Sequence, residues 1–257
     1  MMSCRFVFIG AGNLATRLSF EFKKKGYIIE QVYSRTESSA KALAGLVVAD
    51  YTTDPALVAK NADVYFVALK DSVIHEVLPL IDFNNSLVVH CSGSLPLSEL
   101  ERYSVNTGVF YPLQTFSKFR DVNFDHIPVF IESEYEANLA FLKRLADKIS
   151  RKVMVLDSEK RVHLHIAAVF ACNFVNRMYT IASDILKAQD IDFNFLHPLI
   201  LETAMKVQEM EPRKAQTGPA VRYDKQIIDV HIEKLQDFGY LKELYELISK
   251  NIYLHHK

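Results

Sequence analysis

The sequence predicts a doubly wound α/β domain followed by an all-helical region. Up to residue 157, short apolar runs alternate with helical stretches, a pattern typical of a mostly parallel sheet that is covered on both faces. Beyond residue 157 the chain shows helical patterns and no convincing strand. We therefore expect two closely packed domains, residues 1–157 and residues 158–257.

The individual elements follow from hydrophobic periodicity and from turn residues. Strands are predicted at Arg5–Ile9, Ile28–Tyr33, Val64–Ala68, Ser86–His90, Thr107–Phe110, Val129–Glu132 and Val153–Leu156. Helices are predicted between them at Leu14–Lys25, Ser38–Ala44, Asp71–Leu80 and Glu134–Ile149. In the second domain, helices are predicted from Ser158, as N-cap, to about Gln189, and at Phe193–Glu209, Lys225–Leu235 and Tyr240–Ile252, with a loop over residues 211–219.

The bulk composition is that of a soluble globular protein, with 257 residues, 49% hydrophobic and 24% charged. A net charge of −1 supplies no basic field for nucleic acid. Three widely spaced cysteines argue against a disulfide framework, and no residues have zinc-ligand spacing. The apolar run Phe6–Ile9 is too short for a signal peptide or a membrane span. We therefore expect a cytoplasmic protein with no metal site and no nucleic-acid or membrane partner.

A glycine-rich turn, Gly10-Ala11-Gly12-Asn13-Leu14-Ala15, follows the first predicted strand. In this GxGxxA pattern Gly10 allows a tight turn, Gly12 lets the backbone approach a pyrophosphate, and Ala15 permits close packing of helix on strand. The pyrophosphate would lie on the free N–H groups of the helix N-terminus. The turn predicts a dinucleotide-binding domain with a Rossmann-type sheet; the alternative is a glycine turn without a ligand. The expected cofactor contacts are Gly10, Ala11, Gly12, Asn13 and Leu14.

The end of the second predicted strand indicates which dinucleotide binds. Sites that prefer NAD usually carry Asp or Glu at this point, bonded to the ribose hydroxyls. Here the strand ends in Ser34, Arg35 and Thr36, without a carboxylate. The two hydroxyls can donate hydrogen bonds, and the guanidinium can pair with a 2′-phosphate. We therefore expect NADP as cofactor; the alternative for Arg35 is an ordinary surface arginine.

Several segments resemble the pyrroline-5-carboxylate reductases, namely Ile9–Ala15, Ser34–Thr36 and Ala62–Lys70. The whole chain is still more similar to an uncharacterised group of NADP oxidoreductases related to them, through His90–Leu95, Gly108–Phe116, His165–Phe174 and Gln216–Pro219. This resemblance implies a Rossmann-like domain, a helical domain similar to the C-terminal domain of 6-phosphogluconate dehydrogenase, NADP, and a homodimer built through the helical domain. It implies no substrate. Where the group commonly has His before Pro-Leu-Gln, this chain has Tyr111, whose phenol can donate a hydrogen bond but cannot replace an imidazole.

In an open α/β sheet the ligand lies outside the carboxyl ends of the strands. Residues that directly follow the predicted strands are therefore candidates, although Lys70 could equally be a solvated surface lysine. We do not expect His90 and Cys91 to form a base and nucleophile, because neighbours on a strand point to opposite faces. The expected cofactor contacts are Leu69, Lys70, Ser92 and Gly93, and the expected substrate contacts are Tyr111 and Gln114.

The long predicted helix carries a polar stripe. His165, Val169 and Asn173 are four residues apart, so they would share one face of an α-helix, and Asn176 lies near them. The resemblance to 6-phosphogluconate dehydrogenase implies that Asn173 holds the substrate, whereas Val169 replaces that enzyme's lysine, so the lysine's role does not transfer. His165 is the candidate proton donor, since histidine titrates near neutral pH. The alternative is a helix-packing histidine.

A segment between two predicted helices is rich in hydrogen-bonding side chains, and in it Arg222 could bind a substrate carboxylate bidentately, including one in a partner subunit's cleft. The alternative is a structural turn with a contact between Arg222 and Asp224.

Taken together, these features predict an NADP-dependent oxidoreductase acting on a small carbonyl or imine compound, with a carboxylate-bearing substrate as one option. His165 and Asn173 are its catalytic candidates, and Tyr111, Gln114, Asn176 and Arg222 its substrate-binding candidates. A non-catalytic NADP(H)-binding sensor or regulatory protein is the alternative. A methyltransferase is a third hypothesis, opposed by the end of the second strand and by the helical domain.

Overall fold

The computed structural model describes residues 4–257. It divides into two compact units, of which the first ends at Asn176 and the second is Arg177–Lys257. The sheet lies in the first unit, and the second contains helices. The predicted boundary at residue 157 marks a change of secondary-structure pattern, whereas the compact units divide later, inside the long helical segment. The domain boundary at residue 157 therefore stays a prediction.

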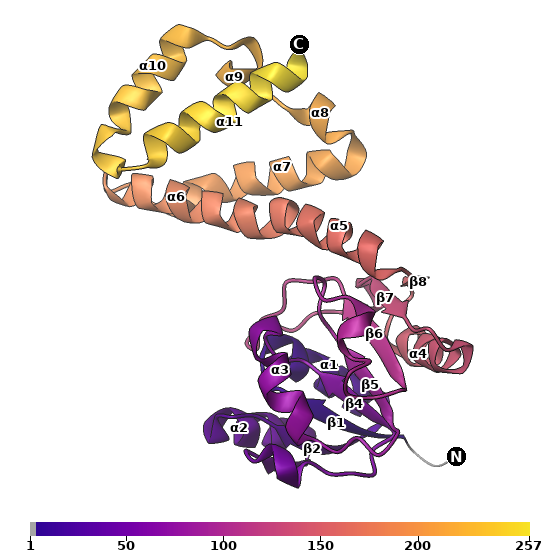
Figure 1. The fold of residues 1–257 in the computed structure, drawn as a ribbon. Helices are drawn as coiled ribbons and strands as arrows, with labels where there is room; N and C mark the ends of the chain where they lie inside the picture. Colours follow the sequence, from indigo (N-terminus) through magenta and orange to yellow (C-terminus); the bar gives the residue numbers. More distant parts are fainter. Residues whose placement is uncertain (1–3) are drawn as a thin grey trace. The chain divides into compact units, whose positions relative to one another are not determined.

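An eight-stranded sheet forms the centre of the first unit, in the order β3-β2-β1-β4-β5-β6-β7-β8 (Figure 1). The strands are β1 (Arg5–Ile9), β2 (Ile28–Tyr33), β3 (Asp50–Thr52), β4 (Val64–Val67), β5 (Leu87–His90), β6 (Thr107–Pro112), β7 (Val129–Glu132) and β8 (Val153–Val155). All neighbouring strands pair in parallel except β6 and β7, which are antiparallel. The predicted fold class, a mostly parallel sheet followed by helices, is confirmed.

The strand β3 was not predicted, because two of its three residues are exposed and it has no apolar run to mark it. Strand order reverses at β1, which is flanked by β2 on one side and by β4 on the other. In sheets of this type the ligand-binding crevice lies at such a switch point, outside the carboxyl ends of the strands.

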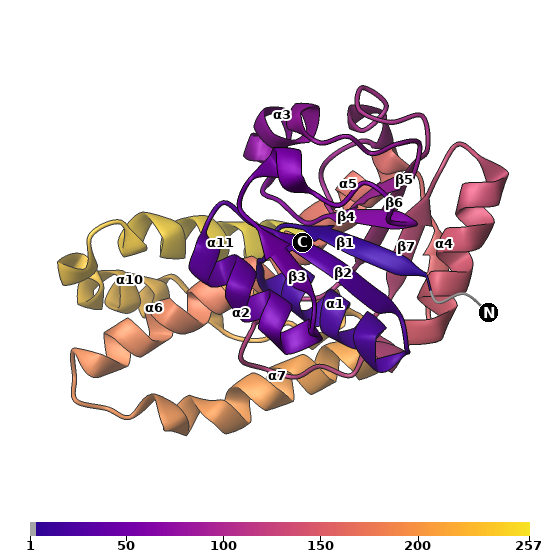
Figure 2. The same ribbon diagram turned by 90° about the horizontal axis from the view of Figure 1, so that it is seen from below.

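Helices cover both faces of the sheet (Figure 2). Alternate residues of β1 point to opposite faces: Phe6 and Phe8 pack with α1, α2 and α4, whereas Val7 and Ile9 pack with α3. The helical elements of the first unit up to β8 are α1 (Asn13–Lys24), α2 (Glu37–Val47), η1 (Pro55–Leu57), η2 (Asp71–Val73), α3 (Ile74–Val77), η3 (Leu78–Leu80), η4 (Leu97–Glu99), η5 (Phe124–His126) and α4 (Glu136–Ile149). The predicted helical segment over residues 71–80 has these bounds, but it is not one continuous α-helix: it consists of η2, α3 and η3, and Pro79 cannot continue an α-helix.

The long helical segment after β8 consists of α5 (Ser158–Ala168), the π-helical η6 (Val169–Phe174) and α6 (Val175–Lys187). Its N-cap is Asp157, whose carboxylate accepts the N–H of Lys160 at 2.8 Å. The prediction of Ser158 as N-cap is therefore wrong, since the Ser158 hydroxyl is engaged by Glu132 instead. The uninterrupted α-helix is also wrong: a π-helical stretch has i→i+5 bonding, so a four-residue spacing no longer keeps side chains on one face through it.

In the second unit, beyond α6, the helical elements are η7 (Phe193–Leu196), α7 (His197–Glu209), α8 (Pro212–Ala215), α9 (Pro219–Arg222), α10 (Lys225–Lys234), η8 (Gln236–Phe238) and α11 (Leu241–His256). The segment predicted as a loop holds α8 and begins α9, each of which starts with a proline, a residue that favours the first helical position. Within residues 4–257, no helix is both long and apolar enough to cross a bilayer.

Candidate functional site

The glycine turn contacts the ends of β2 and β4, the two strands that flank β1. Gly10 has φ +120°, and its N–H donates to the Tyr33 carbonyl at 2.8 Å. A Cβ at Gly10 would lie 2.5 Å from the carbonyl oxygen of Ala68, so only glycine fits there. At Gly12, by contrast, a Cβ would have no heavy atom within 4 Å. The backbone at Gly12 is therefore open to a ligand.

The first turn of α1 is suited to an anion. Its N-cap, Gly12, provides no side-chain hydrogen bond, and no acidic residue lies in the first turn. Helix N-termini carry unpaired N–H groups and the positive end of the helix dipole. Lys23 and Lys24 occupy the last turn, where they complement the opposite end. These features fit a pyrophosphate at the start of α1.

Ser34, Arg35 and Thr36 follow β2 at the same edge of the sheet. The hydroxyl of Ser34 accepts the N–H of Thr36 at 3.4 Å. The Arg35 side chain is 59% exposed, and its guanidinium lies 3.9 Å from the Glu76 carboxylate on α3. An exposed ion pair this loose is worth little, so the guanidinium can turn to a bound anion. The side chains present therefore fit a 2′-phosphate.

The segments after β4 and β5 are joined to each other. The Ser92 hydroxyl donates to the Asp71 carboxylate at 3.1 Å and accepts the N–H groups of Ser94 and Leu95 at 3.0 and 3.1 Å. Its roles in the fold are therefore to cap its own turn and to hold η2. Lys70 is exposed and Leu69 half-buried at the end of β4, and the cofactor contacts predicted for these residues stay predictions.

His90 and Cys91 are buried and shape this turn. The His90 side chain has no exposed surface, and burial, assisted by the nearby charge of Arg161 and opposed by the Pro96 carbonyl, lowers its pKa to about 3. Its Nδ1 accepts the N–H of Ser92 at 3.2 Å, as a neutral imidazole can. Burial raises the pKa of the Cys91 thiol, which leaves it unreactive. Neither side chain is placed for acid–base or nucleophilic chemistry.

Three distant segments meet at His165, on α5. Its Nδ1 is bonded to the Tyr111 hydroxyl, 2.8 Å away at the end of β6, and the two rings pack edge to face. The ring also lies directly against Gly93, where a Cβ would be 2.5 Å from Nδ1 and 2.6 Å from Cγ. Burial raises the pKa of the Tyr111 phenol, although the charge of Arg161 acts in the opposite direction. The phenol thus stays protonated and can donate to the imidazole.

A cleft of about 430 Å³ opens beside this pair, within the size range of small-molecule sites. Small and apolar side chains predominate along it. Its lining residues, all of which belong to the described first unit, include no lysine or arginine. They are Tyr111, Leu113, Gln114, Thr115, Leu164, His165, Ala167, Ala168, Ala171, Cys172 and Asn173.

The structure brings together some of the predicted site residues. His165, Asn173, Tyr111 and Gln114 all line the cleft, whereas Val169 does not, because the π-helical stretch alters which residues face it. Such stretches are frequent at functional sites. The roles predicted for these residues stay predictions.

Two further candidates lie away from the cleft lining. Asn176 is the last residue of the first unit and does not line the cleft. Arg222 ends α9 in the second unit, where it is exposed. Their predicted roles as substrate contacts are not tested by this arrangement.

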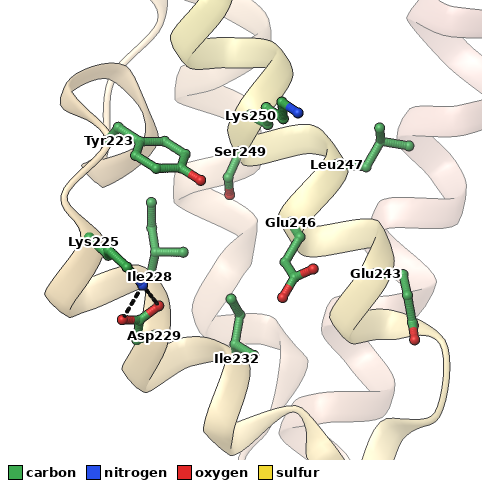
Figure 3. A pocket seen from close by; sticks show the side chains of 10 residues that line it. All are labelled: Tyr223, Lys225, Ile228, Asp229, Ile232, Glu243, Glu246, Leu247, Ser249 and Lys250. Atoms are coloured by element: carbon green, nitrogen blue, oxygen red, sulfur yellow. Dashed lines mark hydrogen bonds and ion pairs between the residues drawn. The ribbon is translucent and has the colours of Figure 1, made fainter.

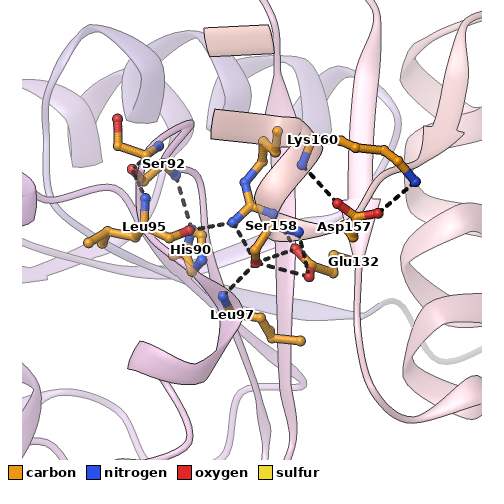
Figure 4. Close-up of polar contacts among 10 residues, drawn as sticks. His90, Ser92, Leu95, Leu97, Glu132, Asp157, Ser158 and Lys160 are labelled. Atoms are coloured by element: carbon orange, nitrogen blue, oxygen red, sulfur yellow. Dashed lines mark hydrogen bonds and ion pairs between the residues drawn. The ribbon is translucent and has the colours of Figure 1, made fainter. Parts of the chain in front are cut away.

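A buried polar network lies at the start of α5 (Figure 4). Glu132, at the end of β7, accepts hydrogen bonds from the Ser158 N–H and hydroxyl at 2.9 Å and forms an ion pair with Arg161. The Arg161 guanidinium also donates to the Leu95 carbonyl. The Ser158 hydroxyl in turn accepts the N–H of Leu97 at 2.9 Å. The network joins α5 to the sheet and to the segment after β5.

A separate hollow of about 420 Å³ lies in the second unit, between α10 and α11 (Figure 3). Lys225 and Asp229, on its α10 side, form an ion pair at 2.7 Å. Acidic and basic side chains are mixed around it, with Glu243, Glu246 and Lys250 on the α11 side. Because its two lysines and three carboxylates alternate around it rather than forming a patch of one sign, we assign it no ligand. Among residues 4–257, no group of three or more His, Cys, Asp or Glu side chains could hold a metal ion.

Two family models match separate parts of the chain. Residues 5–93 match the family described as NADP oxidoreductase, coenzyme F420-dependent, and residues 127–252 match a domain of unknown function, DUF2520. The solved structure of the putative NADP oxidoreductase from Bacteroides fragilis is 48% identical, covers 98% of both chains and has a TM-score of 0.95. The chain belongs to this NADP oxidoreductase family.

More distant relatives share the fold of this chain. A Thermotoga maritima protein is 26% identical over 98% of this chain and 99% of its own, with a TM-score of 0.81. An imine reductase from Myxococcus stipitatus, in complex with NADP+, is 14% identical over 97% and 92% of the two chains, with a TM-score of 0.66, and shows the fold alone. No protein with a curated description matches the sequence.

Sequence reasoning missed two features of this candidate site. The alanines at 167, 168 and 171 line the cleft, and their recurrence on one helical segment is the signal that could have indicated it. The sequence patterns did not single out Arg161, although a basic residue four positions before His165 shares its helix face. That Arg161 is buried against Glu132 follows from long-range packing, for which the sequence carries no local signal.

Proposed function

We propose that the chain is an NADP(H)-dependent oxidoreductase that transfers a hydride between NADPH and a small carbonyl or imine compound. The observation that carries this proposal is the His165–Tyr111 pair packed on Gly93, beside a cleft at the carboxyl ends of β5 and β6. The shared fold of the imine reductase from Myxococcus stipitatus, and of the reductive aminase from Aspergillus terreus at 11% identity and a TM-score of 0.72, supports the reaction class.

The cofactor would be held by the residues at the carboxyl ends of β1, β2, β4 and β5. The open backbone of Gly12 and the uncapped start of α1 suit the pyrophosphate, and Arg35 suits the 2′-phosphate. When bound, NADPH supplies the hydride. The further contacts proposed are Ala11, Asn13, Leu14, Ser34, Thr36, Leu69, Lys70, Ser92 and Gly93.

His165 supplies the proton in this proposal. When both ring nitrogens carry a hydrogen, Nδ1 donates to the Tyr111 hydroxyl oxygen, and no side chain of the described residues is bonded to Nε2. Nε2 gives its proton to the nitrogen or oxygen of the substrate as NADPH delivers the hydride to the carbon, which leaves a neutral imidazole with its hydrogen on Nδ1. Tyr111 holds the ring in the required orientation. General acid catalysis of this kind contributes roughly 10²- to 10⁴-fold to a rate.

The cleft favours a neutral substrate with an apolar group. Its alanine and leucine side chains can surround such a group, with Gln114 and Asn173 available for hydrogen bonds at the rim. Because no lysine or arginine lines it, a carboxylate-bearing substrate would require a permanently charged cation from outside this set of residues. From the sequence pattern alone, Arg222 stays our candidate for binding a substrate carboxylate, and Asn176 a candidate substrate contact.

Cofactor preference is the first test. Fluorescence titration should show that NADPH binds at least several-fold more tightly than NADH. Arg35→Ala should weaken NADPH binding by about 10-fold or more and leave NADH binding nearly unchanged, because a charge-assisted hydrogen bond is worth about 1.5–3 kcal/mol. The control is Arg151→Ala, another exposed arginine in a loose ion pair, with Asp125 at 3.4 Å. Equal affinities for the two cofactors in the wild type would refute the assignment of NADP.

A non-catalytic NADP(H)-binding protein is the second candidate. It is favoured by Val169, which stands where the 6-phosphogluconate dehydrogenase type has a lysine, and by Tyr111, which stands where the related group commonly has histidine. Tight NADPH binding without NADPH oxidation across a panel of keto and imino compounds would select it.

We also propose a homodimer built through the helical unit. The apolar side chains of Leu199, Leu201 and Met205 on α7 are 62%, 61% and 48% exposed. Apolar surface on this scale indicates a contact with another protein surface, and isologous dimers are the commonest assemblies of identical chains. Sedimentation equilibrium should give twice the mass of the chain, and Leu201→Glu should shift the equilibrium towards monomer. A wild type that stays monomeric at every concentration would exclude the dimer.

A further inference from the structure

A buried ion pair lies one helical turn before His165. Arg161 has no exposed surface, and the Glu132 side chain that it contacts is 15% exposed. Besides Glu132, the guanidinium donates to the Leu95 carbonyl and to the Ser158 hydroxyl, the latter at 3.2 Å. Burying such a pair gives little net stability, because the cost of removing both charges from water offsets their attraction. The groups that the ion pair holds in place therefore indicate its role better than the stability that it adds to the fold.

The pair connects α5 to the segment that carries Gly93. Two hydrogen bonds join the first turn of α5 to this segment. Arg161 donates to the Leu95 carbonyl, and the Ser158 hydroxyl accepts the N–H of Leu97. Glu132 holds both Arg161 and Ser158, so the end of β7 anchors the junction (Figure 4).

Gly93 is held from its other side as well. Ser92, immediately before it, is bound through its N–H to His90 and through its hydroxyl to Asp71. Gly93 is therefore fixed between Ser92 and Leu95, and its lack of a side chain leaves space for the His165 ring. Arg161 and His165 are four residues apart within α5, so they lie one above the other on the same face.

We infer that Arg161 and Glu132 are positioning residues, which place the imidazole of His165 against Gly93 and within hydrogen-bond distance of Tyr111. This inference rests on the proposed function for its catalytic consequence, but the placement itself can be measured without turnover. A planar guanidinium can reach a carboxylate, a carbonyl and a hydroxyl at once, whereas the ammonium of lysine on its flexible stem cannot reproduce that set.

The test compares Arg161→Lys, Arg161→Met and Ser158→Ala with the control Lys160→Met. Lys160 is the adjacent basic residue, exposed and paired only with Asp157, at 2.9 Å. Each variant is assayed by steady-state kinetics on the best substrate of a keto and imino compound panel and by NADPH titration. The ring nitrogens of His165 are also observed by ¹⁵N NMR in the cofactor-free protein. Circular dichroism reports whether each variant is folded. If the Arg161 variants do not fold, the comparison is made with Ser158→Ala, the mildest change.

We expect Arg161→Lys to lower kcat by about 10- to 100-fold, because the reacting groups are misplaced by a fraction of an ångström to an ångström. The KM and the NADPH dissociation constant should stay within about twofold of the wild type. The His165 nitrogen signals should change in Arg161→Lys and Ser158→Ala and stay unchanged in Lys160→Met. Folded variants with unaltered His165 signals and unaltered kcat would overturn the inference and leave the pair a structural one. If the wild type oxidises no NADPH, the proposed function fails, and the NMR comparison alone still decides the placement.

Discussion

Replacing His165 with asparagine should lower kcat by about 100-fold or more and leave the NADPH affinity within about twofold of the wild type. Asparagine can still bond to the Tyr111 hydroxyl, but its amide cannot donate a proton as an acid. Loss of a general acid costs roughly 10²- to 10⁴-fold. Because the imidazole contacts Gly93 and Tyr111 but does not belong to the glycine turn, cofactor binding should be nearly preserved.

The measurement is NADPH oxidation with a panel of keto and imino compounds, alongside fluorescence titration with NADPH. The matched control is His163→Asn, two residues earlier on α5, where the exposed imidazole is bonded only to the Glu159 carbonyl, at 2.9 Å. His163→Asn should behave as the wild type. If His165→Asn turns over at the wild-type rate, His165 is a packing histidine, the alternative that the sequence left open.

Gly93→Ala should reduce kcat by at least about 10-fold without any change to a titratable side chain. The added Cβ would lie 2.5 Å from Nδ1, 2.6 Å from Cγ and 2.9 Å from Cβ of His165, so the imidazole would have to leave its place beside Tyr111. Overpacking of this kind typically costs about 1–3 kcal/mol in the free energy of unfolding. The backbone at Gly93 has no positive φ, so the effect comes from the side-chain contact.

Urea unfolding and steady-state kinetics measure both consequences of Gly93→Ala. The control is Gly45→Ala on α2, where a Cβ would have no heavy atom within 4 Å and where alanine favours the helix. It should leave kcat unchanged and raise stability slightly. The double variant Gly93→Ala/His165→Ala removes both partners of the clash, so it should recover the lost stability but not the activity. A Gly93→Ala variant with wild-type kcat and stability would show that the imidazole does not lie on Gly93.

The parts of the fold that could be predicted are those with a local signal. Strands β1 and β2 were predicted with the bounds that the structure shows, because β1 is mostly apolar, β2 begins and ends with apolar pairs, and each has a turn after it. Strand β3 has only Thr52 buried, and η6 differs from an α-helix by its hydrogen-bond register alone, so neither has a hydrophobic period to indicate it. Pro79 did carry a local signal, and reading it would have divided the predicted helix over residues 71–80.

For the site, sequence by itself determined the cofactor-binding turn and the class of protein. The turn Gly10–Ala15 works through backbone conformation and the start of one helix, so its residues are neighbours in the chain and their spacing is enough to identify it. Only the tertiary structure decided that Gly93, Tyr111 and His165 touch, and that Arg161 is buried beside Glu132. These contacts join strand ends to a helix far along the chain. They depend on how side chains of particular shapes pack between elements, and hydrophobic periodicity specifies which face is buried but not which residues meet there.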